Sequence, residues 1–163
     1  MQRTLLICRH ATTQEPFPLQ PDFERALSFG GIKEAHATGQ WIRENFIKID
    51  ALVASPARRT TATARILASR LYFPEEKIKF NPTLYNGHES HLLNCLGELP
   101  DEVRTVLLVA HNPGVTRLAR ELTSQQIAYL EPSCVAAVSL NIANWQEIHV
   151  ATGTLLEHKL ERI

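Results

Sequence analysis

Short runs of consecutive apolar residues alternate along the chain with longer segments in which apolar residues recur at helical spacing. The runs at 3–8, 50–55 and 105–110 are almost continuously apolar, which is typical of strands buried on both faces of a sheet. The segments 31–46 and 59–72 mix apolar and polar positions in a pattern that predicts amphipathic helices. This alternation of strand and helix predicts a mostly parallel sheet with helices on both faces.

The remaining elements have weaker patterns and lie mainly in the second half of the chain. The stretch 13–21, which carries prolines, is expected to be a surface loop. Just after it, Asp22 and Arg25 are expected to form a local pair. We expect a three-layer α/β/α sandwich formed by one domain, residues 1–163. Its further elements are a short strand at 77–80, helices at 89–99 and 113–122, and late antiparallel strands at 135–140 and 154–158.

Composition narrows the class of protein without naming a function. The 163 residues are 44% hydrophobic and 21% charged, as in ordinary globular proteins, and 17 basic residues balance 17 acidic ones. Because a nucleic-acid-binding protein normally carries a basic excess, we expect no nucleic-acid partner. No apolar run approaches the ~20 residues of a membrane span, and the N-terminus lacks the apolar core of a secretory signal. Three widely spaced cysteines, predicted to be buried and unpaired, suit a reducing cytoplasm.

Polar and charged residues gather directly after three of the predicted strands. Arg9 and His10 follow the first strand, Ser55 and Arg59 the second, and His111 the third. The carboxyl ends of parallel strands lie along one edge of a sheet, where ligands bind in α/β proteins. Two arginines and two histidines would therefore share one pocket, and the forked donors of arginine suit a phosphate group. Helices that begin after the second and third clusters would point their N-termini at the same anion.

The order and spacing of these clusters resemble the histidine phosphatase superfamily, also called the phosphoglycerate mutase-like family. The resemblance is carried by the motifs Arg9-His10, Ser55-Pro56-x-x-Arg59 and Val109-Ala110-His111. The usual Arg-His-Gly is here Arg-His-Ala. Within the superfamily, the short chain and the segments 22–25, 84–85 and 111–113 resemble the SixA-type phosphohistidine phosphatases.

The resemblance implies a phosphoglycerate mutase-like fold and a phosphatase that works through a covalent intermediate, and we expect no metal or other cofactor. It makes His10 the nucleophile and assigns Arg9, Arg59 and His111 to the phosphoryl oxygens. Thr13 is a further expected phosphate contact. Because an imidazole attacks phosphorus only when it is neutral, the like charge of the arginines would help by lowering the pKa of His10. Water then hydrolyses the phospho-His10 intermediate.

No carboxylic acid occupies an evident general-acid position, and this bears on the substrate. Glu89 is the nearest candidate, but its position is more typical of the first turn of a helix. An alkoxide leaving group (pKa ~15) needs a proton donor, whereas imidazole (pKa ~6.5) departs easily. The short chain also leaves little sequence for an insertion over the pocket. We therefore expect the substrate to be phosphohistidine on a protein, such as a histidine phosphocarrier domain.

Three alternatives stay open at this point. A phosphomonoesterase of the same superfamily would act on a small phosphorylated metabolite, and a phosphate-binding adaptor would keep the pocket without turnover. A metal hydrolase is the third, because His88 and His91 could place two imidazoles on one helical face with ligand-like spacing. No acidic cluster accompanies those histidines, and nearby arginines would repel a cation.

Overall fold

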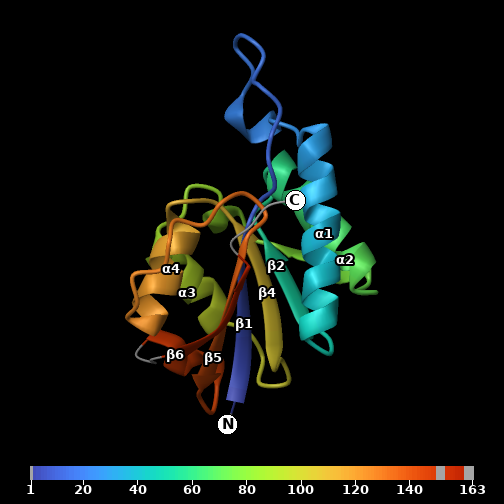
Figure 1. Cartoon of the computed structure of the whole chain (residues 1–163). Coiled ribbons are helices and arrows are strands. Elements are labelled where there is room, and N and C mark those ends of the chain that lie inside the picture. The colour runs from blue at the N-terminus through green and yellow to red at the C-terminus, as the bar shows by residue number, and fades with distance from the viewer. Residues whose placement is uncertain (1, 150–152, 160–163) are drawn as a thin grey trace.

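A six-stranded mixed sheet forms the centre of the structure, a computed structural model that describes residues 2–149 and 153–159 (Figure 1). The strands lie in the order β3-β2-β4-β1-β5-β6. Neighbours among the first four are parallel, whereas β5 and β6 are added antiparallel. The bounds are β1 (Gln2–Arg9), β2 (Ala51–Ala54), β3 (Lys79–Phe80), β4 (Thr105–Ala110), β5 (Val135–Asn141) and β6 (Gly153–Lys159). The predicted sheet, parallel first and antiparallel late, is confirmed.

Helices cover both faces of this sheet, as predicted. One face carries α1 (Phe29–Asn45) and α2 (Arg58–Arg70), and the other carries α3 (Glu89–Gly97) and α4 (Gly114–Thr123) (Figure 1). Within the described residues, none of the helices has the length and apolar character that a membrane crossing requires. The apolar pattern did not predict four short 3-10 helices, because a single turn has no period to detect. They are η1 (Asp22–Glu24), η2 (Glu75–Lys77), η3 (Pro82–Leu84) and η4 (Trp145–His149).

The central strand β1 has apolar side chains on both of its faces, which explains its continuous apolar run. Leu5 and Ile7 belong to the core beneath α3 and α4, whereas Leu6 and Cys8 belong to the core beneath α1 and α2. All four side chains are fully buried, as expected for a central strand of a sheet covered on both sides. The three cysteines are buried and none forms a disulfide, which confirms the prediction made for them.

Arg3 is a fully buried charged residue of β1, and its guanidinium is hydrogen-bonded to backbone carbonyl groups. Its guanidinium donates to the carbonyl oxygens of Asp101, Val103 and Ala143 at 2.8, 2.7 and 2.6 Å. It also lies 5.7 Å from the ring centroid of Trp145. Hydrogen bonds of this kind let a cation be buried without the penalty of an unpaired charge. Arg3 thus ties the start of β1 to two distant loops.

Gly31, in the first turn of α1, is where the helix comes closest to the segment that follows β1. A Cβ atom at this position would lie 2.0 Å from the carbonyl oxygen of Thr12, a contact that only movement of backbone can relieve. We expect Gly31→Ala to lower the free energy of unfolding by about 1–3 kcal/mol. Gly30→Ala is the matched control, since its Cβ would meet nothing closer than 3.9 Å. Urea unfolding measures both, and equal stability of the two variants would contradict the expectation.

Candidate active site

The residues that follow β1, β2 and β4 meet at one edge of the sheet. Arg9 at the end of β1 lies beside Ala110 at the end of β4 in the parallel register. His10, Ser55 and His111 come directly after these three strands. The imidazole rings of His10 and His111 lie 5.6 Å apart, centroid to centroid. The structure therefore brings together the side chains that the sequence placed at one edge.

The His10 imidazole is held in one tautomer and kept neutral. Its Nδ1 lies 2.7 Å from the carbonyl oxygen of Ala11, and because a carbonyl only accepts, Nδ1 carries the proton. The lone pair is then on Nε2. Burial is the main cause that lowers the pKa of His10 from 6.5 to about 4, and the charges of Arg9 and Arg59 lower it further. A neutral imidazole with a free Nε2 is what a nucleophile for phosphorus needs.

His111 presents a buried ring nitrogen that has no partner. Its Nε2 lies 2.8 Å from Oγ of Ser55, and Ser55 Oγ in turn accepts from the backbone N–H of Ala57. The Ser55 hydroxyl can still donate to Nε2 or accept from it, and where it donates, the His111 proton lies on Nδ1. Nδ1 is buried without a hydrogen-bond partner in the described structure. Burial, followed by the charge of Arg59, lowers the pKa of His111 to about 3. The ring is therefore neutral, and one of its nitrogens is buried and unpartnered among the described residues.

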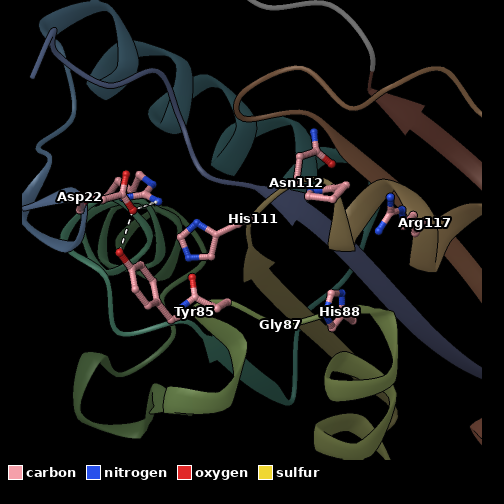
Figure 2. Close-up of a pocket in the computed structure, with 10 residues that line it drawn as sticks. Asp22, Tyr85, Gly87, His88, His111, Asn112 and Arg117 are labelled. Carbon is pink, nitrogen blue, oxygen red and sulfur yellow. Dashed lines mark hydrogen bonds and ion pairs between the residues drawn. The ribbon is translucent and has the colours of Figure 1, made fainter.

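Arg59 and Asp22 form an ion pair in the site. Figure 2 shows Asp22 near Tyr85 and His111. Arg59 reaches the site from the first turn of α2, and its side chain is 9% exposed. One terminal nitrogen donates to the backbone carbonyl of Asp22 at 2.8 Å, and the other donates to the Asp22 carboxylate at 3.0 Å. Tyr85 donates its hydroxyl to the same carboxylate oxygen at 2.7 Å. In this structure both forked donors of Arg59 are occupied, one by a neutral carbonyl oxygen and the other by a carboxylate oxygen.

The Asp22 carboxylate is stabilised in its charged form. The hydrogen bond from Tyr85 is the largest cause that lowers the pKa of Asp22, and the hydrogen bond and charge of Arg59 lower it further. Burial and the hydrogen bond to Asp22 raise the pKa of the Tyr85 hydroxyl. At neutral pH Asp22 is therefore an anion and Tyr85 a neutral donor. The sequence missed both contacts, although Asp22 and Tyr85 lie in segments that carry the family resemblance.

Arg9 and Thr13 are engaged by neighbouring groups near the site. Arg9 donates to the carbonyl oxygen of Leu130 at 3.1 Å. The Thr13 hydroxyl accepts from Arg25 at 2.7 Å, and Thr13 also forms an isolated β-bridge with Leu27. The expected local pair of Arg25 with Asp22 is present at 3.7 Å, but it is not the main contact of either residue. The phosphate roles of Arg9 and Thr13 stay predictions.

Glu89, His88 and His91 lie at the start of α3, where the two histidines form the cap of the helix. Glu89 is the first residue of α3 and does not line the cavity beside His111. The backbone N–H of His88 donates to Nδ1 of His91 at 3.1 Å, and their rings stack at 5.8 Å. Among the residues that the structure describes, no three His, Cys, Asp or Glu side chains gather in a way that could hold a metal ion. The pair His88 and His91 therefore has a local structural use.

The low pKa values of the two histidines predict how stability depends on pH. In the unfolded chain these imidazoles bind protons below about pH 6.5, whereas in the folded chain His10 does so only below about pH 4 and His111 below about pH 3. Between these limits the unfolded state binds more protons, so the free energy of unfolding falls as the pH falls from about 6.5 to about 4. Urea unfolding at several pH values, with NMR titration of His10, measures this. An NMR midpoint for His10 near pH 6.5 would contradict it.

The match to a sequence model of the histidine phosphatase superfamily (branch 1) spans residues 5–85, which include most of β1, all of β2 and Arg59. The chain belongs to this superfamily. It is also 29% identical to an uncharacterised protein of Mycobacterium leprae, over 94% of this chain and 99% of the other. An uncharacterised protein of Mycobacterium tuberculosis is 25% identical over 94% of this chain and 99% of the other.

Among solved structures, the fold is similar to that of SixA-type proteins. One from Nakamurella multipartitia, described as a phosphohistidine phosphatase SixA, is 24% identical with a TM-score of 0.82, covering 97% of this chain and 95% of the other. The protein histidine phosphatase SixA complexed with tungstate is 23% identical with a TM-score of 0.81, covering 96% of both chains. A mycobacterial glucosyl-3-phosphoglycerate phosphatase is 16% identical with a TM-score of 0.76, covering 99% of this chain and 100% of the other. These likenesses establish the phosphoglycerate mutase-like fold.

Proposed function

We propose that this chain is a phosphatase that removes the phosphoryl group from phosphohistidine on a protein, through a covalent phospho-His10 intermediate. The observation that carries the proposal is the arrangement around His10. A neutral, buried imidazole whose Nδ1–H donates to the carbonyl oxygen of Ala11 lies beside the ring of His111, whose Nδ1 has no partner among the described residues, and Arg59 holds a carboxylate nearby. A tetrahedral dianion fits such a set of donors.

The reaction proceeds in two displacements at phosphorus. In the first, Nε2 of His10 forms a bond to phosphorus while the bond from phosphorus to the substrate nitrogen breaks, and the substrate ring, which carries a proton on its other nitrogen, departs as neutral imidazole. In the second, a water oxygen bonds to phosphorus, the bond to His10 breaks, and inorganic phosphate is released. Arg59, Arg9 and His111 stabilise the charge on the three equatorial oxygens in both steps. Nδ1–H of His10, held by Ala11, keeps the ring oriented throughout.

The residues that line the cavity favour a leaving group that needs no proton from the enzyme. Asp22 is the carboxylate among the residues that line it, and the low pKa of Asp22 keeps it ionised. Tyr85 has a raised pKa and directs its proton to Asp22, so neither side chain is poised as a general acid. Imidazole leaves readily without such an acid, whereas an alkoxide does not. This argument supports phosphohistidine over alkyl phosphate as the substrate.

A small phosphorylated metabolite is the second candidate substrate. The cavity beside His111 has a volume of about 280 Å³, which would hold a compact metabolite. One structure of similar fold is named as a glucosyl-3-phosphoglycerate phosphatase, a name that describes a small-molecule substrate for that protein. The fold by itself is therefore compatible with either substrate class.

The test compares one enzyme on three substrates: a phosphohistidine phosphocarrier domain, an aryl phosphate and an alkyl phosphate. We expect kcat/KM for phosphohistidine to be the highest, and the alkyl ester to be the slowest because its leaving group is the poorest. Equal or faster turnover of the alkyl ester would overturn the assignment of substrate. A folded chain that binds phosphate but neither releases it from any substrate nor becomes labelled would be an adaptor instead.

A further inference from the structure

The cavity beside His111 reaches from Asp22 and Tyr85 at one end to Arg117 at the other (Figure 2). The end nearer to His10, which we call the inner end, is lined by Asp22, Arg59, Tyr85 and His111. Its outer end is lined by Asn86, Gly87, His88, Asn112, Pro113 and Arg117. His10 is not among the residues that line it, but the ring of His10 lies 5.6 Å from that of His111, which does line it. A substrate whose phosphoryl group is bound by Arg59 and His111 would have room for the rest of its atoms, the leaving group, in this cavity.

Arg117 lies at the outer end of the cavity, and no acidic residue in the described part of the chain forms an ion pair with it. It lies in the first turn of α4, exposed, across the cavity from Asp22 with His111 between them (Figure 2). Its guanidinium makes no hydrogen bond or ion pair with any residue that the structure describes. Arg59, at the inner end, is by contrast neutralised by Asp22. The positive charge of Arg59 is thus paired with a carboxylate, whereas that of Arg117 is not paired with any residue that the structure describes.

The other polar groups at the outer end do not compete for Arg117. The Asn112 side chain is fully used, because it donates to Leu130 and accepts from the backbone and the hydroxyl of Thr116. No Asp or Glu is among the residues that line this end. A carboxylate or phosphate is therefore the group that would complete the cavity, since arginine binds such groups through paired donors.

We propose that Arg117 determines specificity by binding a second anionic group, a carboxylate or a phosphate, on the leaving-group side of the substrate. The inference rests on the proposed phosphoryl transfer at His10 and adds the requirement that the substrate carries a second anionic group. The anion has two sources: an acidic side chain close to phosphohistidine in a protein, or a second acidic group of a small metabolite. In both, Arg117 contacts a part of the substrate that does not react, so it acts on binding more than on the chemical step.

The first experiment measures binding and needs no turnover. Phenyl phosphate and carboxyphenyl phosphate differ by one carboxylate, and their Kd values are compared in a His10→Ala background. We expect the carboxylated ester to bind about fivefold more tightly, and Arg117→Gln to remove that difference, as for an exposed ion pair. Arg58→Gln removes the same charge from an exposed position outside this cavity and is expected to keep the difference. Equal binding of the two esters, or a difference that survives Arg117→Gln, would overturn the proposal.

The second experiment uses the chain with His10 intact and separates the two sources of the anion. Phosphohistidine peptides with aspartate or asparagine beside the phosphohistidine are compared with the two esters. Arg117→Gln is expected to raise KM about fivefold for each acidic member of a pair with kcat unchanged. A KM effect confined to the peptides identifies a protein source, and one confined to the esters identifies a metabolite. Absence of turnover with a normal binding preference would instead contradict the proposed phosphatase function and leave the anion site standing.

Discussion

His10→Ala is expected to abolish phosphoryl transfer, with kcat lower by about 10⁴-fold or more. The reason is that the covalent route loses its nucleophile, and no other neutral imidazole can replace it. His111, whose ring lies 5.6 Å away, has its Nε2 hydrogen-bonded to Ser55 and its Nδ1 buried. The measurement is the trapping of acid-labile phosphate on the protein after mixing with radiolabelled substrate. Wild type should be labelled at His10, and the variant should not.

His36→Ala provides the matched control for this experiment. The His36 ring accepts a hydrogen bond from Arg70 on the outer helix layer and does not line the cavity beside His111. It is expected to keep labelling and turnover within about twofold, as is usual for a surface substitution. Circular dichroism and thermal unfolding establish that each variant is folded. Normal turnover by folded His10→Ala would rule out the phospho-His10 intermediate.

Arg59→Ala is the substitution with the second-largest expected effect, a loss of about 10³-fold in kcat/KM. Arg59 supplies two forked donors in a site where it is almost completely buried, and the structure shows one donor on the backbone carbonyl and the other on the carboxylate of Asp22. In the transition state these donors would hold two phosphoryl oxygens instead. Loss of the guanidinium also leaves Asp22 with only the more distant charge of Arg25, at 3.7 Å, so the carboxylate would repel the incoming phosphate.

Two further variants separate the geometry of Arg59 from its charge. Arg59→Lys keeps the charge but not the fork, and we expect it to recover no more than about tenfold of the lost activity. Arg58→Ala, on the neighbouring exposed residue, should stay within about twofold of wild type. Steady-state kinetics on an aryl phosphate measure all three. Full activity of Arg59→Lys would show that charge alone suffices, and equal losses at 58 and 59 would contradict the assignment of Arg59.

Local patterns in the sequence were enough to predict the layers and the place of the site. Continuous apolar runs identify strands buried on both faces, and the amphipathic segments identify the helices that bury them. Parallel strands bring their carboxyl ends to one edge, so the residues after β1, β2 and β4 had to meet there. The resemblance to the superfamily motif Ser-Pro-x-x-Arg assigned Arg59 to phosphate, and the structure buries Arg59 while its neighbour Arg58 is exposed.

The sequence by itself therefore determined the sheet, its covering helices and the proximity of His10, Arg59 and His111. Each of these follows from a periodicity or from a rule of sheet topology. Only the tertiary structure decided that Asp22 contacts both Arg59, 37 residues away in the sequence, and Tyr85, 63 residues away. The path of a loop depends on many weak contacts and leaves no periodic pattern. For the same reason, the sequence did not predict the cavity that ends at Arg117, which is lined by residues of α4 and of the loop before α3.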